Sequence, residues 1–190
     1  LVLAPVVGLV FYFFFGQNLS KQRIISRRMR KRITLQLEEA EHAAGPEIPK
    51  AYRPLARLLR TTSHAVPLYG SRITPYTDGS SKMEALLGEI ARARHHIHLQ
   101  YYIFCDDETG RRLRDALVEK ARQGVHVRIL YDDVGCSGVR KSFFEGMRRE
   151  GIEVHAFLHV KFPRFTSKVN YRNHRKIVVI DGRVGFIGGM

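Results

Sequence analysis

The chain has 190 residues, enough for one α/β domain of ordinary size and a short additional segment. Its 32 Lys and Arg residues outnumber its 18 Asp and Glu residues. The resulting net charge of +14 indicates an anionic partner, either a nucleic acid or a membrane surface with acidic headgroups. The two cysteines, Cys105 and Cys136, show neither CxxC spacing nor a His/Cys metal pattern, and nothing in the sequence suggests a disulfide framework, so they are expected to be reduced, structural thiols.

Residues 1–16 are predicted to form the last part of a transmembrane helix. Leu1–Phe15 is apolar throughout, and as a helix it would cover about 22 Å of a hydrocarbon core about 30 Å thick. A signal peptide carries its basic residues before the apolar run, whereas here they follow it, between Lys21 and Arg32. The positive-inside rule then places the rest of the chain in the cytoplasm.

Residues 17–65 are predicted to be a basic juxtamembrane linker with helical character. Leu19–Ala43 favours a helix with a loose apolar face, which either lies on the bilayer or is a solvated, charged segment. The sequence Ala44-Gly45-Pro46 ends that helix, and Tyr52–Thr61 indicates a second, short one.

A compact domain is expected over residues 66–190. Its first segment, Pro67–Thr77, alternates like paired strands and ends at the turn signal Asp78-Gly79. A helix is then expected from Ser80 or Ser81 to Arg94, with serine as its N-cap. Further strands are expected at Ile97–Cys105, Val125–Tyr131, Ile152–Leu158 and, within Lys176–Ile187, on both sides of Asp181-Gly182; further helices are expected at Glu108–Gln123 and Val139–Glu150. This alternation predicts a layered α/β fold with a substantially parallel sheet.

We also expect the chain to be part of a longer protein. It begins without Met inside an apolar run, and it ends at Gly188-Gly189-Met190, directly after a strand-like segment. Both ends are therefore expected to be truncated.

The segment from Asn173 to Asp181 carries the strongest chemical signal. It fits H-x-K-x4-D through His174, Lys176 and Asp181, lies on an apolar strand, and is followed by Gly188-Gly189. This pattern resembles the phospholipase D superfamily motif, H-x-K-x4-D-x6-G-G/S-x-N, at every position up to Met190.

Strand geometry suggests separate roles for the three motif residues. His174 and Lys176 share one face of a strand, so an imidazole and an ammonium can meet a single phosphate as nucleophile and as counter-charge. Asp181 falls on the other face of a straight strand and is expected to orient or brace the site. The alternative for His174 is a partly buried histidine on an edge strand, but a lysine on the same apolar strand is costly without an anion.

Several further segments resemble the first half of bacterial cardiolipin synthases. The apolar run that closes with Phe15-Gly16-Gln17-Asn18 and a basic stretch resembles the second of two membrane helices in that family. Gln100 is a departure, because many members have Glu there. The other similar segments are Asp78-Gly79, His98–Phe104 with Asp107 and Gly110, Gly124–Gly135, and Arg172–Lys176.

The resemblance implies a phospholipase D-like layered sheet flanked by helices and preceded by a transmembrane helix. It implies phosphatidyl transfer between two phosphatidylglycerol molecules through a phosphohistidine, with release of glycerol and without a cofactor. The histidine of a second motif in the full-length chain would act as general acid, so these residues alone are expected to be inactive unless two copies dimerise. The implied location is the cytoplasmic side of the bacterial inner membrane.

Substrate contacts are expected around the motif. The residues concerned are Arg172, Asn173, Arg175, Gly188 and Gly189. Basic and aromatic residues alternate between Lys161 and Lys176, and they either rim a pocket for an anionic lipid headgroup or form a solvated basic loop around core aromatics.

Metal binding is not expected. His95, His96 and His98 resemble a zinc cluster without the accompanying ligands, and acidic residues at a strand end, such as Asp132 and Asp133, usually make turns. Two other functions stay open at this point, namely a phosphodiesterase or nuclease that uses the positive charge to bind DNA, and a non-catalytic module that binds anionic lipid.

Overall fold

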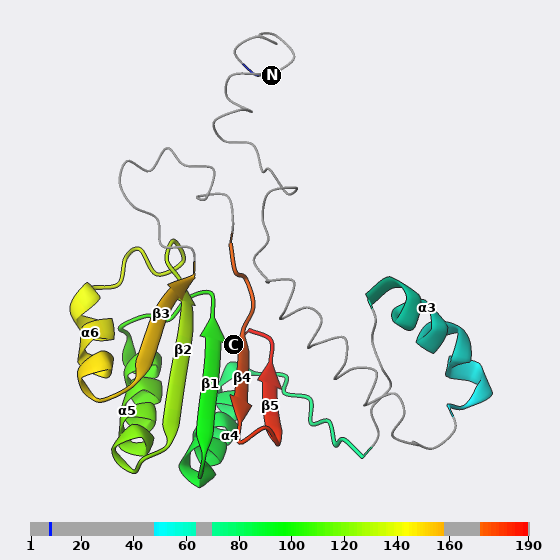
Figure 1. The fold of residues 1–190 in the computed structure, drawn as a ribbon, viewed down its shortest axis with the longest axis horizontal. Coiled ribbons are helices and arrows are strands. Elements are labelled where there is room, and N and C mark those ends of the chain that lie inside the picture. The colour runs from blue at the N-terminus through cyan, green and yellow to red at the C-terminus, as the bar shows by residue number, and fades with distance from the viewer. Residues whose placement is uncertain (1–7, 9–47, 64–69, 158–171, 190) are drawn as a thin grey trace, which may run out of the picture. The chain divides into compact units, whose positions relative to one another are not determined.

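The computed structural model describes residue 8 and residues 48–63, 70–157 and 172–189 (Figure 1). The predicted transmembrane helix at 1–16, apart from Gly8, and the predicted helix at 19–43 lie outside these residues, as does the basic stretch at 161–171. Within the described ranges, no helix is long and apolar enough to cross a membrane. The chain divides into two compact units, with a boundary between Pro75 and Tyr76.

The smaller unit contains a short helix, as predicted. A 3-10 turn, η2 (Lys50–Tyr52), leads into α3 (Arg53–Ser63), and prolines are tolerated in such a first turn because its N–H groups have no helical partner. The predicted pair of strands at Pro67–Thr77 is wrong for its described part, since residues 70–77 form no strand. Gly70 has a φ of 77°, and the side chains from 70 to 77 are exposed, so their alternation has no buried face to build against.

The larger unit is built on a five-stranded sheet with the order β3-β2-β1-β4-β5 (Figure 1). Strands β1 (His96–Tyr101), β2 (His126–Asp132) and β3 (Glu153–Phe157) are parallel, because a helix connects each to the next. Strands β4 (Ile177–Ile180) and β5 (Val184–Ile187) form a hairpin that joins β1 in antiparallel orientation. The mixed α/β fold is thus confirmed, with the parallel pairing limited to three strands.

Between residues 76 and 189, the described part of this unit contains the helices α4 (Gly79–Arg92), α5 (Glu108–Arg122) and α6 (Lys141–Arg149). The expected serine cap of α4 is wrong by two or three residues. Asp78 is the N-cap, and its carboxylate accepts hydrogen bonds from the backbone N–H and the hydroxyl of Ser81. Asp107 caps α5 in the same way, through the N–H of Gly110 at 2.7 Å.

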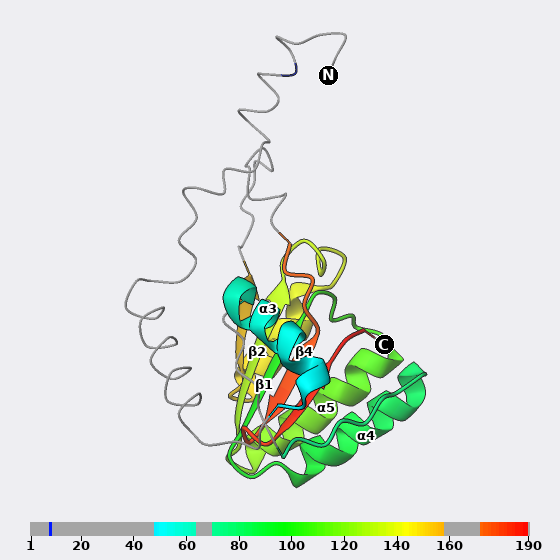
Figure 2. The same cartoon turned by 90° about the vertical axis from the view of Figure 1, so that its right-hand side faces the viewer.

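The core lies on one face of the sheet, the face along which α4 and α5 run in Figure 2. Alternate strand residues point into it, as Leu99 of β1 does in register with Ile129 of β2 and Val178 of β4. The helices contribute Leu86, Ile90, Leu113, Leu117, Phe143, Phe144 and Met147. Each such side chain contributes roughly 1.5–3 kcal/mol through burial, so the strands are held rigidly.

This topology brings several chain segments to one edge of the sheet. Strands β1 and β2 end there because they are parallel, and β4 begins there because it runs in the opposite direction. The residues after Tyr101, the residues after Tyr131 and the residues before Ile177 are therefore neighbours. This edge carries the first half of the H-x-K-x4-D motif.

Candidate active site

His174 and Lys176 meet directly before β4. The ammonium Nζ of Lys176 lies 2.8 Å from Nδ1 of the His174 ring and 3.0 Å from the His174 carbonyl oxygen. An ammonium can only donate, so Nδ1 accepts this hydrogen bond and the ring proton of a neutral imidazole then lies on Nε2. The structure therefore brings together the two side chains that the motif predicted to converge, with a potential nucleophile beside a positive charge.

The backbone before His174 is held by a buried carboxylate. The N–H of Asn173 donates to Oδ2 of Asp132 at 2.8 Å, and Asp132 is only 1% exposed. Its other oxygen accepts the N–H groups of Val134 at 3.1 Å and Gly135 at 2.9 Å, which closes the turn after β2. Asp132 is thus a turn-forming acid, and it also ties that turn to the motif, a link that sequence reasoning missed.

An aromatic ring packs against the pair. The ring centroids of Tyr102 and His174 are 4.4 Å apart at an interplanar angle of 45°, and Lys176 Nζ is 5.3 Å from the centre of the tyrosine ring. Tyr102 follows the last residue of β1. In the sequence this tyrosine lies in a segment similar to the family, but nothing there indicates a role for it.

Asp181 lies beyond the other end of β4, in the turn to β5. Its carboxylate accepts three backbone N–H groups, from Arg94 at 2.8 Å, His95 at 2.8 Å and His96 at 2.9 Å. These hydrogen bonds, that of His96 first among them, lower the pKa of Asp181 to about 2. In this geometry the carboxylate holds the start of β1 against the hairpin, and β4 separates it from Lys176.

The glycine pair after β5 is linked to the motif by a backbone hydrogen bond, and to α4 by a lysine that sequence reasoning missed. The Gly188 N–H donates to the Lys176 carbonyl at 3.0 Å, and Gly188 has a φ of 99°, a conformation that side chains disfavour. Lys82 of α4 is 6% exposed and donates to the carbonyls of Gly188 and Gly189. Burial lowers the pKa of Lys82. A lysine early in a helix usually indicates a solvated position, so the sequence around Lys82 does not indicate that this side chain is buried.

The remaining predicted substrate contacts differ in exposure. Arg172 and Arg175 are exposed on either side of His174, whereas Asn173 is 8% exposed. The two arginines are therefore accessible to an anion, and Asn173 acts in this structure through its backbone.

The histidines at the start of β1 form a second polar cluster, apart from the motif. The rings of His96 and His98 are 4.9 Å apart, and burial, followed by the charge of His96, lowers the pKa of His98. Among the described residues, no group of three or more histidine, cysteine or acidic side chains is placed to hold a metal ion.

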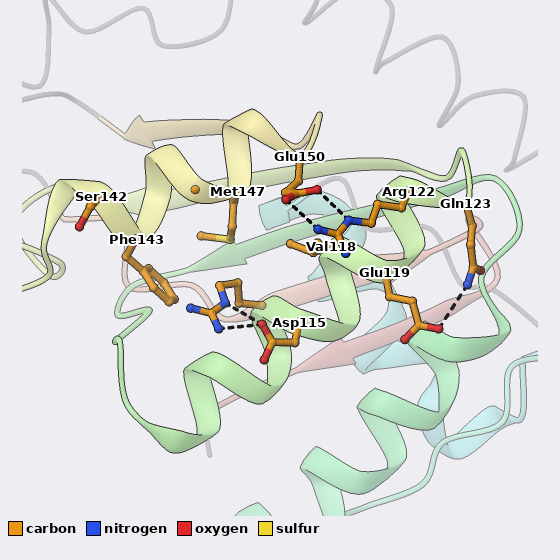
Figure 3. Close-up of a pocket in the computed structure, with 11 residues that line it drawn as sticks. Asp115, Val118, Glu119, Arg122, Gln123, Ser142, Phe143, Met147 and Glu150 are labelled. Carbon is orange, nitrogen blue, oxygen red and sulfur yellow. Dashed lines mark hydrogen bonds and ion pairs between the residues drawn. The ribbon is translucent and has the colours of Figure 1, made fainter.

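A groove of about 650 Å³ lies between α5 and α6 (Figure 3). Phe143, Met147 and Val118 supply its apolar lining, and Arg122 and Glu150 form an ion pair across it at 2.7 Å. The residues that line the groove belong to these two helices and their ends, and the motif residues are not among them.

Comparison with known proteins agrees with the site. Residues 86–190 match a family model described as "Cardiolipin synthase, PLD-like domain". The chain belongs to this family. Over 194 residues it is 40% identical to the major cardiolipin synthase ClsA of Bacillus subtilis (strain 168), an alignment that covers 97% of this chain and 40% of that protein. A cardiolipin synthase of Geobacillus kaustophilus (strain HTA426) is 41% identical over 191 residues, or 98% of this chain and 38% of that protein.

The chain thus spans about two fifths of the length of these members of the cardiolipin synthase family. Among solved structures, NucT from Helicobacter pylori aligns with a TM-score of 0.43 at 21% identity, covering 57% of this chain and 65% of that one. At that score the likeness has no bearing on function.

Proposed function

We propose that this chain is the first catalytic part of a cardiolipin synthase, a phosphatidyltransferase that joins two phosphatidylglycerol molecules and releases glycerol. The observation that carries the proposal is the contact between the Lys176 ammonium and the His174 imidazole at 2.8 Å, within a chain of the cardiolipin synthase family. The net charge of +14 supports an anionic lipid as substrate.

The reaction divides into two displacements at phosphorus. A ring nitrogen of His174 attacks the phosphodiester of the first phosphatidylglycerol, the bond from phosphorus to the glycerol oxygen breaks, and the leaving glycerol takes a proton from a general acid. In the second step a hydroxyl of another phosphatidylglycerol attacks phosphorus and gives its proton to the group that acted as general acid in the first step, and the phosphorus–nitrogen bond breaks so that His174 is regenerated. Lys176 stabilises the negative charge on the nonbridging oxygens in both steps. We assign the general acid to the histidine of a second motif.

Lys176 also controls when His174 can attack. In the structure the Nδ1 lone pair accepts the ammonium hydrogen bond and is therefore not available to phosphorus. Charged phosphoryl oxygens are stronger acceptors than a neutral imidazole, so a bound phosphodiester draws the ammonium away from Nδ1. Substrate binding and release of the nucleophile are thereby coupled through one side chain.

The remaining parts of the proposal concern the surroundings of the site. Arg172 and Arg175 are exposed beside His174 and are assigned to the headgroup phosphate. Residues 1–16 are assigned to the membrane, which keeps the site at a surface where phosphatidylglycerol is concentrated. The positive-inside rule then places residues 17–190 on the cytoplasmic side of the bacterial inner membrane.

The test uses the complete gene product in vesicles that contain labelled phosphatidylglycerol. The wild type is expected to form cardiolipin and glycerol, and His174→Ala is expected to form none. His126→Ala is the matched control, because this exposed histidine begins β2, at the opposite end of that strand from Asp132. Unchanged cardiolipin output from His174→Ala would overturn the mechanism, and phosphatidic acid as the main product would replace the transferase with a hydrolase.

A further inference from the structure

We infer that Tyr102 is a positioning residue, whose ring sets the orientation of the His174 imidazole and the location of the Lys176 ammonium for attack on phosphorus. This inference rests on the proposed function. It concerns a side chain outside the H-x-K-x4-D motif, on the segment that follows β1.

The ring of Tyr102 contacts both groups that the reaction uses. It lies 4.4 Å from the His174 ring at 45°, and its centroid is 5.3 Å from Lys176 Nζ. A tilted aromatic pair restricts rotation of the imidazole, and the π face attracts the ammonium. His174 is exposed, so water alone would leave its ring free to rotate. The tyrosine supplies the surface against which it rests.

The loop after β2 packs against Tyr102 and fixes its position. A Cβ atom at Gly135 would lie 2.3 Å from the Tyr102 carbonyl oxygen and 3.0 Å from the ring atom Cε2, so the loop backbone packs directly against this residue. The thiol of Cys136 donates to the same carbonyl at 3.7 Å, and the N–H of Phe104 donates to the sulfur at 3.2 Å. Burial raises the pKa of Cys136 to about 11, so the thiol keeps the proton that it donates.

The same loop also fixes the backbone of the motif. Asp132 begins the turn that contains Gly135, and its carboxylate holds the N–H of Asn173. One loop therefore places Tyr102 on one side and the residue before His174 on the other. The nucleophile is held between a fixed ring and a fixed backbone, although its own side chain is exposed.

The experiment uses the complete gene product with Tyr102→Leu and Tyr102→Phe, assayed on phosphatidylglycerol in mixed micelles. Tyr102→Leu removes the ring and is expected to lower kcat by on the order of ten- to a hundredfold, the scale of small misplacements of a reacting group. KM is expected to change by less than about twofold, because misorientation affects the reacting atoms and leaves the headgroup contacts in place. Tyr102→Phe keeps the ring and is expected to retain kcat.

Two further variants separate positioning from folding. Tyr76→Leu is the matched control, since Tyr76 stacks on Phe186 at 6.3 Å and has no ring contact with His174. It is expected to keep kcat per folded molecule. Gly135→Ala keeps the tyrosine but displaces it, and it is expected to lower kcat with little change in KM. For a variant of low stability, the amount of labelled phosphohistidine formed in a single turnover is measured and divided by the amount of folded protein. This value is then compared with that of the wild type.

The outcomes distinguish the two proposals. A wild type that forms no cardiolipin sinks the proposed function and this inference with it. The wild type could instead be active and His174→Ala inactive, which supports the proposed function. If Tyr102→Leu then keeps its kcat per folded molecule, only the role of Tyr102 is overturned. A fall in kcat of the same size in Tyr102→Phe would also overturn it, because the ring is retained in that variant.

Discussion

The two ends of β4 differ in how they hold their polar residues. Before the strand, His174 and Lys176 contact each other and the ring of Tyr102 through side-chain atoms, and His174 is exposed. After the strand, the Asp181 carboxylate accepts three backbone N–H groups. One end therefore has groups that a ligand can reach and rearrange, whereas the other has a carboxylate whose partners belong to the fold.

This difference shows how one short motif can combine two kinds of residue. Four strand residues, Ile177–Ile180, separate Lys176 from Asp181, and two of them are buried in the core. They keep the start of β4 beside Tyr102 and its end beside the start of β1. We accordingly assign chemistry to His174 and Lys176, and a supporting role to Asp181.

Replacement of Lys176 by Met tests the first end and should have the largest effect. It removes the charge that stabilises the phosphoryl oxygens, so kcat for phosphatidyl transfer is expected to fall by about 10²–10³. The thermal midpoint should change little, because the contacts of Lys176 are largely solvent-accessible. Lys120→Met is the matched control, since Lys120 also donates to a backbone carbonyl, that of Ala91 at 3.0 Å. Loss of activity accompanied by an equal loss of folded protein would contradict this assignment.

Replacement of Asp132 by Ala should weaken the support of the first end. It leaves three N–H groups without their acceptor at a site that is 1% exposed, and unsatisfied buried groups cost about 1–3 kcal/mol each. Because water reaches part of the opened turn, we expect a total loss of about 3 kcal/mol in the free energy of unfolding, measured with urea. Asp115→Ala removes an exposed carboxylate of α5 and serves as control. Equal unfolding midpoints for the two variants would show that the hydrogen bonds of the Asp132 carboxylate, including the one from Asn173, contribute nothing to the free energy of unfolding.

Much of the fold followed from hydrophobic spacing along the chain. The apolar alternation of β1, β2 and β3 and the helical spacing of α5 and α6 depend on neighbouring residues, and these elements lie within a few residues of their predicted positions. Pro67–Thr77 shows the limit of such reasoning, because alternation predicts a strand only where one face is buried.

The site was predictable only in its motif. His174 and Lys176 are two positions apart, so their convergence depends on local geometry. The contacts of Asp132 with Asn173 and of Lys82 with Gly188 join residues 41 and 106 positions apart. These contacts depend on which strands are neighbours and in which direction each strand runs. No pattern in one sequence indicates that Tyr102, directly after one strand, lies beside the start of another.

Replacement of Asp181 by Asn tests the second end, and its expected effect is smaller and depends on pH. The folded protein lowers the pKa of this carboxyl group from 3.8 to about 2, so the unfolded chain binds its proton at a higher pH than the folded protein does. The carboxylate therefore contributes stability that is fully present above about pH 5 and is lost as the pH falls towards 2. The thermal midpoint of the variant should lie below that of the wild type at pH 7, and the gap should narrow between pH 5 and pH 3. A gap that stays constant over this range would mean that the charge of Asp181 is irrelevant and that its shape alone holds the turn.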